Sequence, residues 1–183
     1  MRSEAENRGI KTPKIHVYTG DGKGKTTAAL GLGLRAVGCG FSVCMIQFLK
    51  DEPTGELKAI QKLPNFKVFR FQEKAKGFFC QMSDEEKEVL KAETENALSF
   101  AEKLLKDRGC DVLILDEIFI CLSCGLVSQE RLLKLIQSKN AEIILTGRDA
   151  PESIKIAADY VSEICATKHP YDSGCSARLG IEY

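Results

Sequence analysis

Short apolar runs alternate along this chain with longer segments in which apolar residues recur every three or four positions. Compact apolar runs predict buried β-strands. They lie at residues 15–18, 42–49, 111–116, 142–145 and 160–165. A weaker run at 67–71 alternates apolar with charged residues and predicts an edge strand. Near-continuous apolar strands are buried on both faces, so we expect a parallel sheet.

Helical patterns fill the intervals between these runs. An alanine- and leucine-rich segment covers residues 28–37. A second helix is predicted from Ser83 to Gly109, because Ser83 and Glu86 form a capping box and Gly109 is a typical C-terminal stop. Two further helices are predicted to begin at Ser128 and near Pro151, whose missing N–H is harmless in a first turn.

This alternation predicts an α/β fold: a doubly wound, mostly parallel sheet with helices on both faces. At 183 residues the chain fits one domain, and the sequence shows no internal repeat or interdomain linker. We assign that domain to residues 14–183. The short basic segment 1–13 is expected to be a flexible arm.

The overall charge excludes some classes of partner. Lys plus Arg and Asp plus Glu both number 26, which gives zero formal net charge and argues against nucleic acid as the main partner. No apolar run approaches the roughly 18 residues of a membrane helix. The polar start of the chain lacks the apolar stretch of a signal peptide. We therefore expect a cytoplasmic protein with no membrane partner.

The chain contains eight cysteines, spread across apolar segments. Cys121 and Cys124 have C-x-x-C spacing, but no second pair completes a four-ligand zinc set. Buried, reduced thiols are the expected state.

The segment 19–27, TGDGKGKTT, carries the clearest chemistry. It joins a predicted strand to a predicted helix, and glycines there let backbone N–H groups point at anionic oxygens. A glycine-rich hairpin turn would need neither the buried strand before it nor the Lys-Thr ending. In this phosphate loop Lys25 is expected to reach phosphate, and Thr26 to bind Mg²⁺. The strict pattern has glycine where Thr19 stands. The predicted nucleotide-binding residues are Gly20, Asp21, Gly22, Lys23, Gly24, Lys25, Thr26 and Thr27.

Two later strands end in charged residues. Asp116 and Glu117 follow four apolar residues, and open α/β sheets bind ligands at that strand edge. Asp116 is expected to hold Mg²⁺ directly or through water, and Glu117 to orient a water or a ribose hydroxyl. Arg148 follows another strand, where it would hold phosphate or form a surface salt bridge.

The two histidines, His16 and His169, are far apart in the sequence and are expected to be structural. This scarcity of general bases suits a reaction that depends on positioning and leaving-group charge.

Four segments of the sequence together carry a family resemblance: the phosphate loop 19–27, IQFLK at 46–50, LTGR at 145–148, and the tail 168–183, KHPYDSGCSARLGIEY. With the order and spacing of these segments, the chain from about Pro13 to Tyr183 resembles the P-loop type of corrinoid adenosyltransferase, the ATP:cob(I)alamin adenosyltransferases. The resemblance implies a P-loop NTPase fold of the RecA-like type.

The reaction implied by the resemblance transfers the 5′-deoxyadenosyl group of ATP to a reduced corrinoid, in adenosylcobalamin biosynthesis or salvage. Cobalt(I) attacks the C5′ carbon and tripolyphosphate leaves, so no protein base is needed. Family members bind ATP in reverse relative to other P-loop enzymes. The implied substrates are ATP and cob(I)alamin or cobinamide, with Mg²⁺ or Mn²⁺ as cofactor.

The resemblance also implies roles for single residues. Lys25 and Arg148 would neutralise the triphosphate, Thr26 and Asp116 would serve the metal, and Glu117 would contact ribose or metal. The segment 77–80 matches the corrinoid-facing part of the family, where Phe78 would displace the lower ligand of cobalt. Some relatives have tryptophan at the position of Cys80, which leaves Phe79 to share that role. Ordinary core packing is the alternative for both phenylalanines.

The implied partners are a second copy of the chain, in a homodimer, and an electron donor such as a flavoprotein. Two other functions remain open at this point. A small P-loop kinase or ATP hydrolase would need the same loop and carboxylates, and an ATP-gated carrier would hold adenosylcobalamin without making it.

Overall fold

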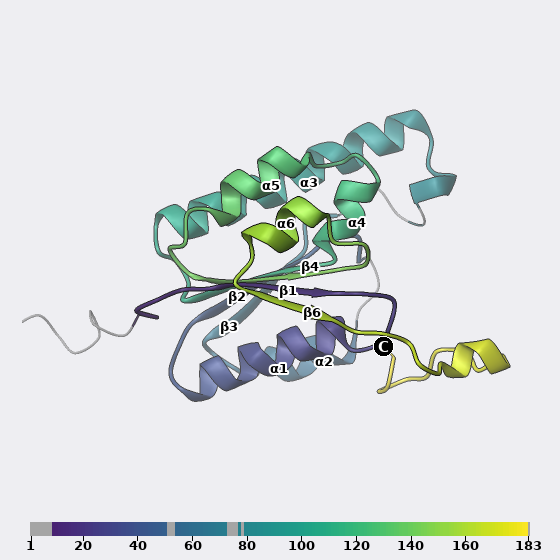
Figure 1. The fold of residues 1–183 in the computed structure, drawn as a ribbon, viewed down its shortest axis with the longest axis horizontal. Helices are drawn as coiled ribbons and strands as arrows, with labels where there is room; N and C mark the ends of the chain where they lie inside the picture. Colours follow the sequence, from purple (N-terminus) through teal and green to yellow (C-terminus); the bar gives the residue numbers. More distant parts are fainter. Residues whose placement is uncertain (1–8, 51–53, 73–76, 78, 183) are drawn as a thin grey trace, which may run out of the picture.

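The computed structural model describes residues 9–50, 54–72, 77 and 79–182. Its centre is a six-stranded sheet in the order β3-β2-β4-β5-β1-β6, with every pair of neighbours parallel (Figure 1). The strands are β1 Ile15–Thr19, β2 Val43–Gln47, β3 Phe66–Phe69, β4 Val112–Asp116, β5 Glu142–Thr146 and β6 Tyr160–Glu163. The prediction of a parallel α/β sheet is therefore confirmed.

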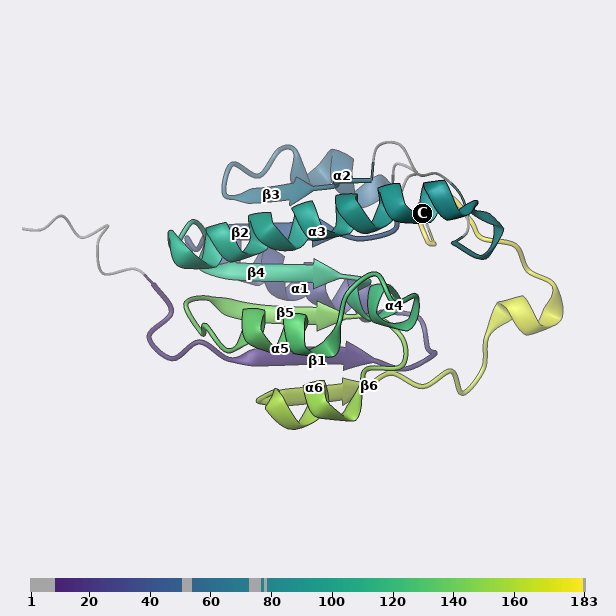
Figure 2. The ribbon, with the colours of Figure 1, turned by 90° about the horizontal axis from the view of Figure 1, so that it is seen from above.

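Helices cover both faces of this sheet, as predicted (Figures 1 and 2). Helices α1 (Lys25–Gly38) and α2 (Gly55–Ile60) lie on one face. The other face carries α3 Asp84–Lys106, α4 Ile118–Ser123, α5 Gln129–Ile136 and α6 Glu152–Ala157. Two separate apolar clusters fill the space between the sheet and these helix layers, which is the packing of a doubly wound fold. Two short 3₁₀ helices, Phe79–Gln81 and Pro170–Ser173, precede α3 and follow β6.

The two edge strands differ in burial. β3 forms one edge, as its mixed pattern predicts. β6 forms the other edge, and all four of its residues are exposed. Its apolar residues therefore do not have the two-sided burial that the sequence predicts for the sheet, because in the described part of the chain β6 pairs only with β1.

Helices α2 and α4 and the start of α6 differ from the predictions. Helices α2 and α4 have six residues each and were not predicted, because so short a segment shows too little periodicity. Pro151 is the N-cap of α6 and lies just before the first turn, whereas the sequence predicts it inside that turn.

None of the helices in the described part of the chain combines the length and apolar character of a transmembrane span.

The start of α3 has the predicted capping box. The Ser83 hydroxyl accepts a hydrogen bond from the Glu86 N–H (3.2 Å), and the Glu86 carboxylate accepts one from the Ser83 N–H (2.8 Å). We expect Ser83→Ala to lower the free energy of unfolding by about 1 kcal/mol, measured by urea denaturation. Ser99→Ala, at an exposed position inside the same helix, is the matched control and should cost nothing. Equal losses in both variants would contradict the capping role.

Candidate active site

The phosphate loop joins β1 to α1 as the sequence predicts. Thr19, at the position of the missing glycine, is the last residue of β1 and is buried. Its hydroxyl accepts a hydrogen bond from the Ala150 N–H at 3.1 Å. A threonine is therefore useful here, because it ties the phosphate loop to the loop that carries Arg148.

Two glycines of the loop lie against the segment that follows β6. The Gly22 N–H donates to the Ile164 carbonyl at 2.7 Å. A Cβ atom on Gly20 would come within 2.5 Å of that carbonyl oxygen, and one on Gly22 within 2.7 Å. Gly20 also has a φ of 99°, which side-chain-bearing residues rarely adopt. Only glycine fits at either position.

Lys25 opens α1 and is buried within the loop. Its ammonium donates to the carbonyls of Gly20 (2.7 Å) and Gly22 (2.8 Å). Burial lowers its pKa, and the nearby Arg148 guanidinium acts in the same direction, while Glu117 and Asp21 oppose the shift. The loop thus holds a positive charge at the start of α1, as a phosphate site requires.

Asp116 is the centre of a buried hydrogen-bond network at the carboxyl edge of the sheet. Its side chain is fully buried. One carboxylate oxygen accepts hydrogen bonds from the hydroxyls of Thr26 (2.8 Å) and Thr146 (2.7 Å). The other accepts from the ammonium of Lys50 (2.6 Å) and the amide of Gln47 (3.2 Å). The network therefore connects β2, β4 and β5 to the first turn of α1.

Glu117 follows directly, in a left-handed conformation with φ 63°. Its N–H donates to the Thr146 hydroxyl at 3.0 Å. Burial raises the pKa of its carboxyl, and the neighbouring charge of Asp116 raises it further; Lys50, Lys25 and Arg148 only partly offset this.

This shift gives a testable pH dependence. A carboxyl whose pKa is raised on folding contributes its full stability below its ordinary value of 4.5 and loses it as the pH rises through the folded-state pKa. Glu117→Gln cannot ionise, so we expect it to be more stable than the wild type by up to about 1 kcal/mol near neutral pH. The difference should vanish at about pH 4, as urea denaturation at the two pH values can measure. A constant difference would contradict the expectation.

These residues line a pocket of about 800 Å³ beside the phosphate loop. The pocket brings together the predicted residues Asp21 to Thr27, Glu117 and Arg148. Gly20 and Asp116 are not among its lining residues, and Asp116 meets it only through Thr26 and Lys50. Arg148 is exposed and its charge acts on Lys25 and Glu117, so it projects to the predicted edge.

The predicted corrinoid-facing segment lies only partly in the described chain, and Phe78 is outside it. Phe79 is half-buried against the larger apolar cluster, with the Lys87 ammonium 5.8 Å from its ring centre. Cys80 is exposed. Figures 1 and 2 both place the 3₁₀ helix Phe79–Gln81 at the end of the molecule where the tail lies.

Sequence reasoning missed several residues of the site. Gln47, Lys50 and Thr146 contact Asp116, and they stand in the segments that carry the family resemblance. The lining also includes Thr54 to Glu56, His169 and Gly180 to Glu182. The signal for the first three was their position: each ends or follows a strand adjacent to Asp116.

The cysteines are reduced, as expected, but the expectation that they are buried is wrong for four of them: Cys39, Cys80, Cys165 and Cys175 are exposed. All eight are free thiols, and burial raises the pKa of both Cys121 and Cys124. Among the described residues, no group of three or more His, Cys, Asp or Glu is placed to hold a metal.

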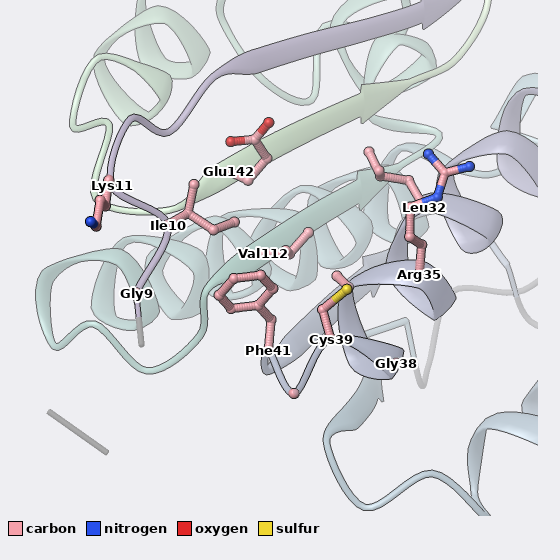
Figure 3. Close-up of a pocket in the computed structure, with 12 residues that line it drawn as sticks. Gly9, Ile10, Lys11, Leu32, Arg35, Gly38, Cys39, Phe41, Val112 and Glu142 are labelled. Carbon is pink, nitrogen blue, oxygen red and sulfur yellow. The ribbon is translucent and has the colours of Figure 1, made fainter. Parts of the chain in front are cut away.

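A second cavity, of about 940 Å³, lies at the opposite edge of the sheet (Figure 3). Ile10, Phe41 and Val112 line it together with the end of α1. Glu142 at its border is held by the ring of His16, at 2.6 Å. The predicted structural role of His16 agrees with this contact. The cavity has no phosphate loop, so the pocket beside Lys25 is the candidate active site.

Comparisons with known proteins agree with this assignment. The sequence profile of the family described as ATP:corrinoid adenosyltransferase BtuR/CobO/CobP matches residues 11–183. The corrinoid adenosyltransferase of Pseudomonas aeruginosa is 34% identical over 181 residues, which cover 97% of this chain and 85% of the relative. The corrinoid adenosyltransferase CobA of Salmonella typhimurium is also 34% identical, with 97% and 87% covered.

Among solved structures, the flagellar accessory protein FlaH from Methanocaldococcus jannaschii matches with a TM-score of 0.52 and 16% identity, over 85% of this chain and 72% of FlaH. That likeness concerns the fold alone. The profile matches nearly the whole chain, and the chain covers most of the length of both relatives. This chain is therefore a transferase of the ATP:corrinoid adenosyltransferase family.

Proposed function

We propose that the pocket beside Lys25 binds ATP and presents its C5′ carbon to a reduced corrinoid. Cobalt(I) supplies the electron pair of the new carbon–cobalt bond, and the bond from C5′ to the triphosphate oxygen breaks. Tripolyphosphate leaves with the electron pair of the broken carbon–oxygen bond. The observation that carries the proposal is the gathering of the phosphate loop, Lys25, Arg148 and Glu117 around one cavity.

The protein's task in this reaction is to stabilise the leaving group. Lys23 to Thr27 offer backbone N–H groups at the start of α1, where an anion is favoured. Lys25 needs only to turn from two loop carbonyls to reach a phosphate, and Arg148 would neutralise further charge. Glu117 is the candidate contact for ribose or metal. Positioned charges that stabilise the negative charge developing on a leaving group are usually the largest single contribution to rate enhancement.

The oxygen atoms of Thr26 and Asp116 fit the hard cation Mg²⁺ or Mn²⁺. Their 2.8 Å contact places a hydroxyl and a carboxylate together at the end of the loop. Because Asp116 is fully buried and Lys50 takes its other oxygen, Thr26 would hold the ion directly and Asp116 from behind it or through water. The ion would neutralise charge on the departing triphosphate.

On the corrinoid side, Phe78 remains the proposed wedge for the lower ligand of cobalt. Phe79 packs against the core, which supports a structural role for that residue. A homodimer and a flavoprotein electron donor complete the proposal and follow from the family resemblance alone. A cytoplasmic location remains the expectation drawn from the sequence pattern.

One assay separates this function from its alternatives. The protein is incubated with ATP, Mg²⁺ and chemically reduced cobalamin, while absorbance reports adenosylcobalamin and chromatography identifies the phosphate product. We expect adenosylcobalamin and tripolyphosphate in equal amounts. ADP formed without corrinoid would instead identify a kinase or hydrolase, and retention of cobalamin without a carbon–cobalt bond would identify a carrier.

A further inference from the structure

The segment after β6 folds back over the phosphate loop. Besides the contact of Gly22 with Ile164, the carboxylate of Asp21 accepts a hydrogen bond from the Ala166 N–H at 3.2 Å. The ammonium of Lys23 donates to the Ile181 carbonyl at 3.0 Å. Three consecutive loop residues are thus tied to the stretch 164–182, which we call the C-terminal strap.

The strap also forms a wall of the nucleotide pocket. His169, Gly180, Ile181 and Glu182 line it opposite the first turns of α1. The strap has its own internal order: the Arg178 side chain and N–H bond to the Glu182 carboxylate at 2.8 to 3.2 Å. It is therefore a built part of the site.

His169 has a defined orientation in this wall. Its Nδ1 accepts a hydrogen bond from the Tyr171 N–H at 3.2 Å and caps the short 3₁₀ helix Pro170–Ser173. An imidazole whose Nδ1 is an acceptor carries its proton on Nε2 when neutral. Within the described residues Nε2 forms no hydrogen bond, although His169 borders a pocket that four cationic side chains also line, those of Lys23, Lys25, Lys50 and Arg148.

We propose that His169 binds the phosphate chain of the nucleotide, with Nε2–H as the donor and the cap at Nδ1 fixing the ring. A donor in a pocket lined by four cations matches an anionic oxygen better than a base edge or an apolar corrin surface. The strap would then complete the phosphate site on the side that the loop and α1 leave open. This inference rests on the proposed function, because it needs the triphosphate to lie in this pocket.

Two isosteric variants test it. His169→Asn keeps an acceptor at the position of Nδ1, and asparagine is a good capping residue, but it has no group at the position of Nε2. His169→Gln keeps an N–H donor near the position of Nε2 and loses the cap. Binding of inorganic tripolyphosphate is measured by calorimetry for the wild type and both variants, with thermal unfolding as the check on folding.

We expect His169→Asn to bind tripolyphosphate roughly tenfold or more weakly, since a hydrogen bond to a charged group is lost. His169→Gln should stay within about threefold of the wild type. Unchanged binding in His169→Asn, or equal losses in both variants, would overturn the role of Nε2. Lys25→Ala is measured alongside: if it also binds like the wild type, the proposed phosphate site itself is wrong, whatever the result for His169.

Discussion

Lys25→Ala is expected to reduce ATP-dependent adenosylation at least about a hundredfold, with the fold preserved. The ammonium is held inside the phosphate loop by the carbonyls of Gly20 and Gly22, and no other described side chain reaches this position. Its removal leaves the departing triphosphate without its nearest positive charge. The rate of adenosylcobalamin formation at saturating corrinoid measures the effect.

The matched control for this variant is Lys91→Ala, at an exposed position on α3 away from the pocket. It removes the same charge from the protein and should retain wild-type activity. Circular dichroism and the unfolding midpoint of Lys25→Ala should stay close to those of the wild type. Wild-type rates in Lys25→Ala would remove the loop from the mechanism.

Asp116→Asn is expected to lose both activity and about 3 kcal/mol of unfolding free energy. An amide in place of the carboxylate keeps the shape, but its NH₂ group would face donors that now bind two oxygens. The Lys50 ammonium, with 23% of its side chain exposed, would lose its buried counter-charge. Urea denaturation measures the loss of stability, and a titration of activity against Mg²⁺ measures the effect on the metal.

Asp111→Asn, at the other end of β4, separates the two effects. Asp111 accepts hydrogen bonds from the Ser42 N–H and hydroxyl, both at 2.8 Å, and lies far from the phosphate loop. It should lose stability while keeping its dependence on Mg²⁺. An identical Mg²⁺ response in both variants would show that Asp116 is only structural.

The fold was largely predictable because its signals are local. Short apolar runs mark the five-residue strands β1, β2, β4 and β5, and the capping residues Ser83 and Ser128 mark the starts of α3 and α5. Neither the exposure of β6 nor the helix α4 has such a signal. The exposure of β6 depends on its position as an edge strand of the sheet. Helix α4 has only six residues, and their apolar pattern fits a strand equally well.

The site was predictable where chemistry and backbone shape coincide, as in the phosphate loop. Its surroundings were not, because they depend on contacts between distant segments. Lys50 meets Asp116 across 66 positions and Thr26 meets it across 90. A lysine after a strand has many possible partners in sequence, and only the order of strands in the sheet selects one of them. The same holds for Lys23 and the Ile181 carbonyl.

The pairing of β1 has a consequence for how the chain folds as it is translated. Its hydrogen-bonded neighbours are β5 and β6, which are made more than a hundred residues later, and Ile164 supplies a contact to Gly22. During translation β1 therefore stays unpaired until most of the chain has been synthesised. Pairings of such long range fold slowly and expose unpaired edges meanwhile. The nucleotide site is thus among the last parts of this molecule to assemble, although its key loop is among the first to be translated.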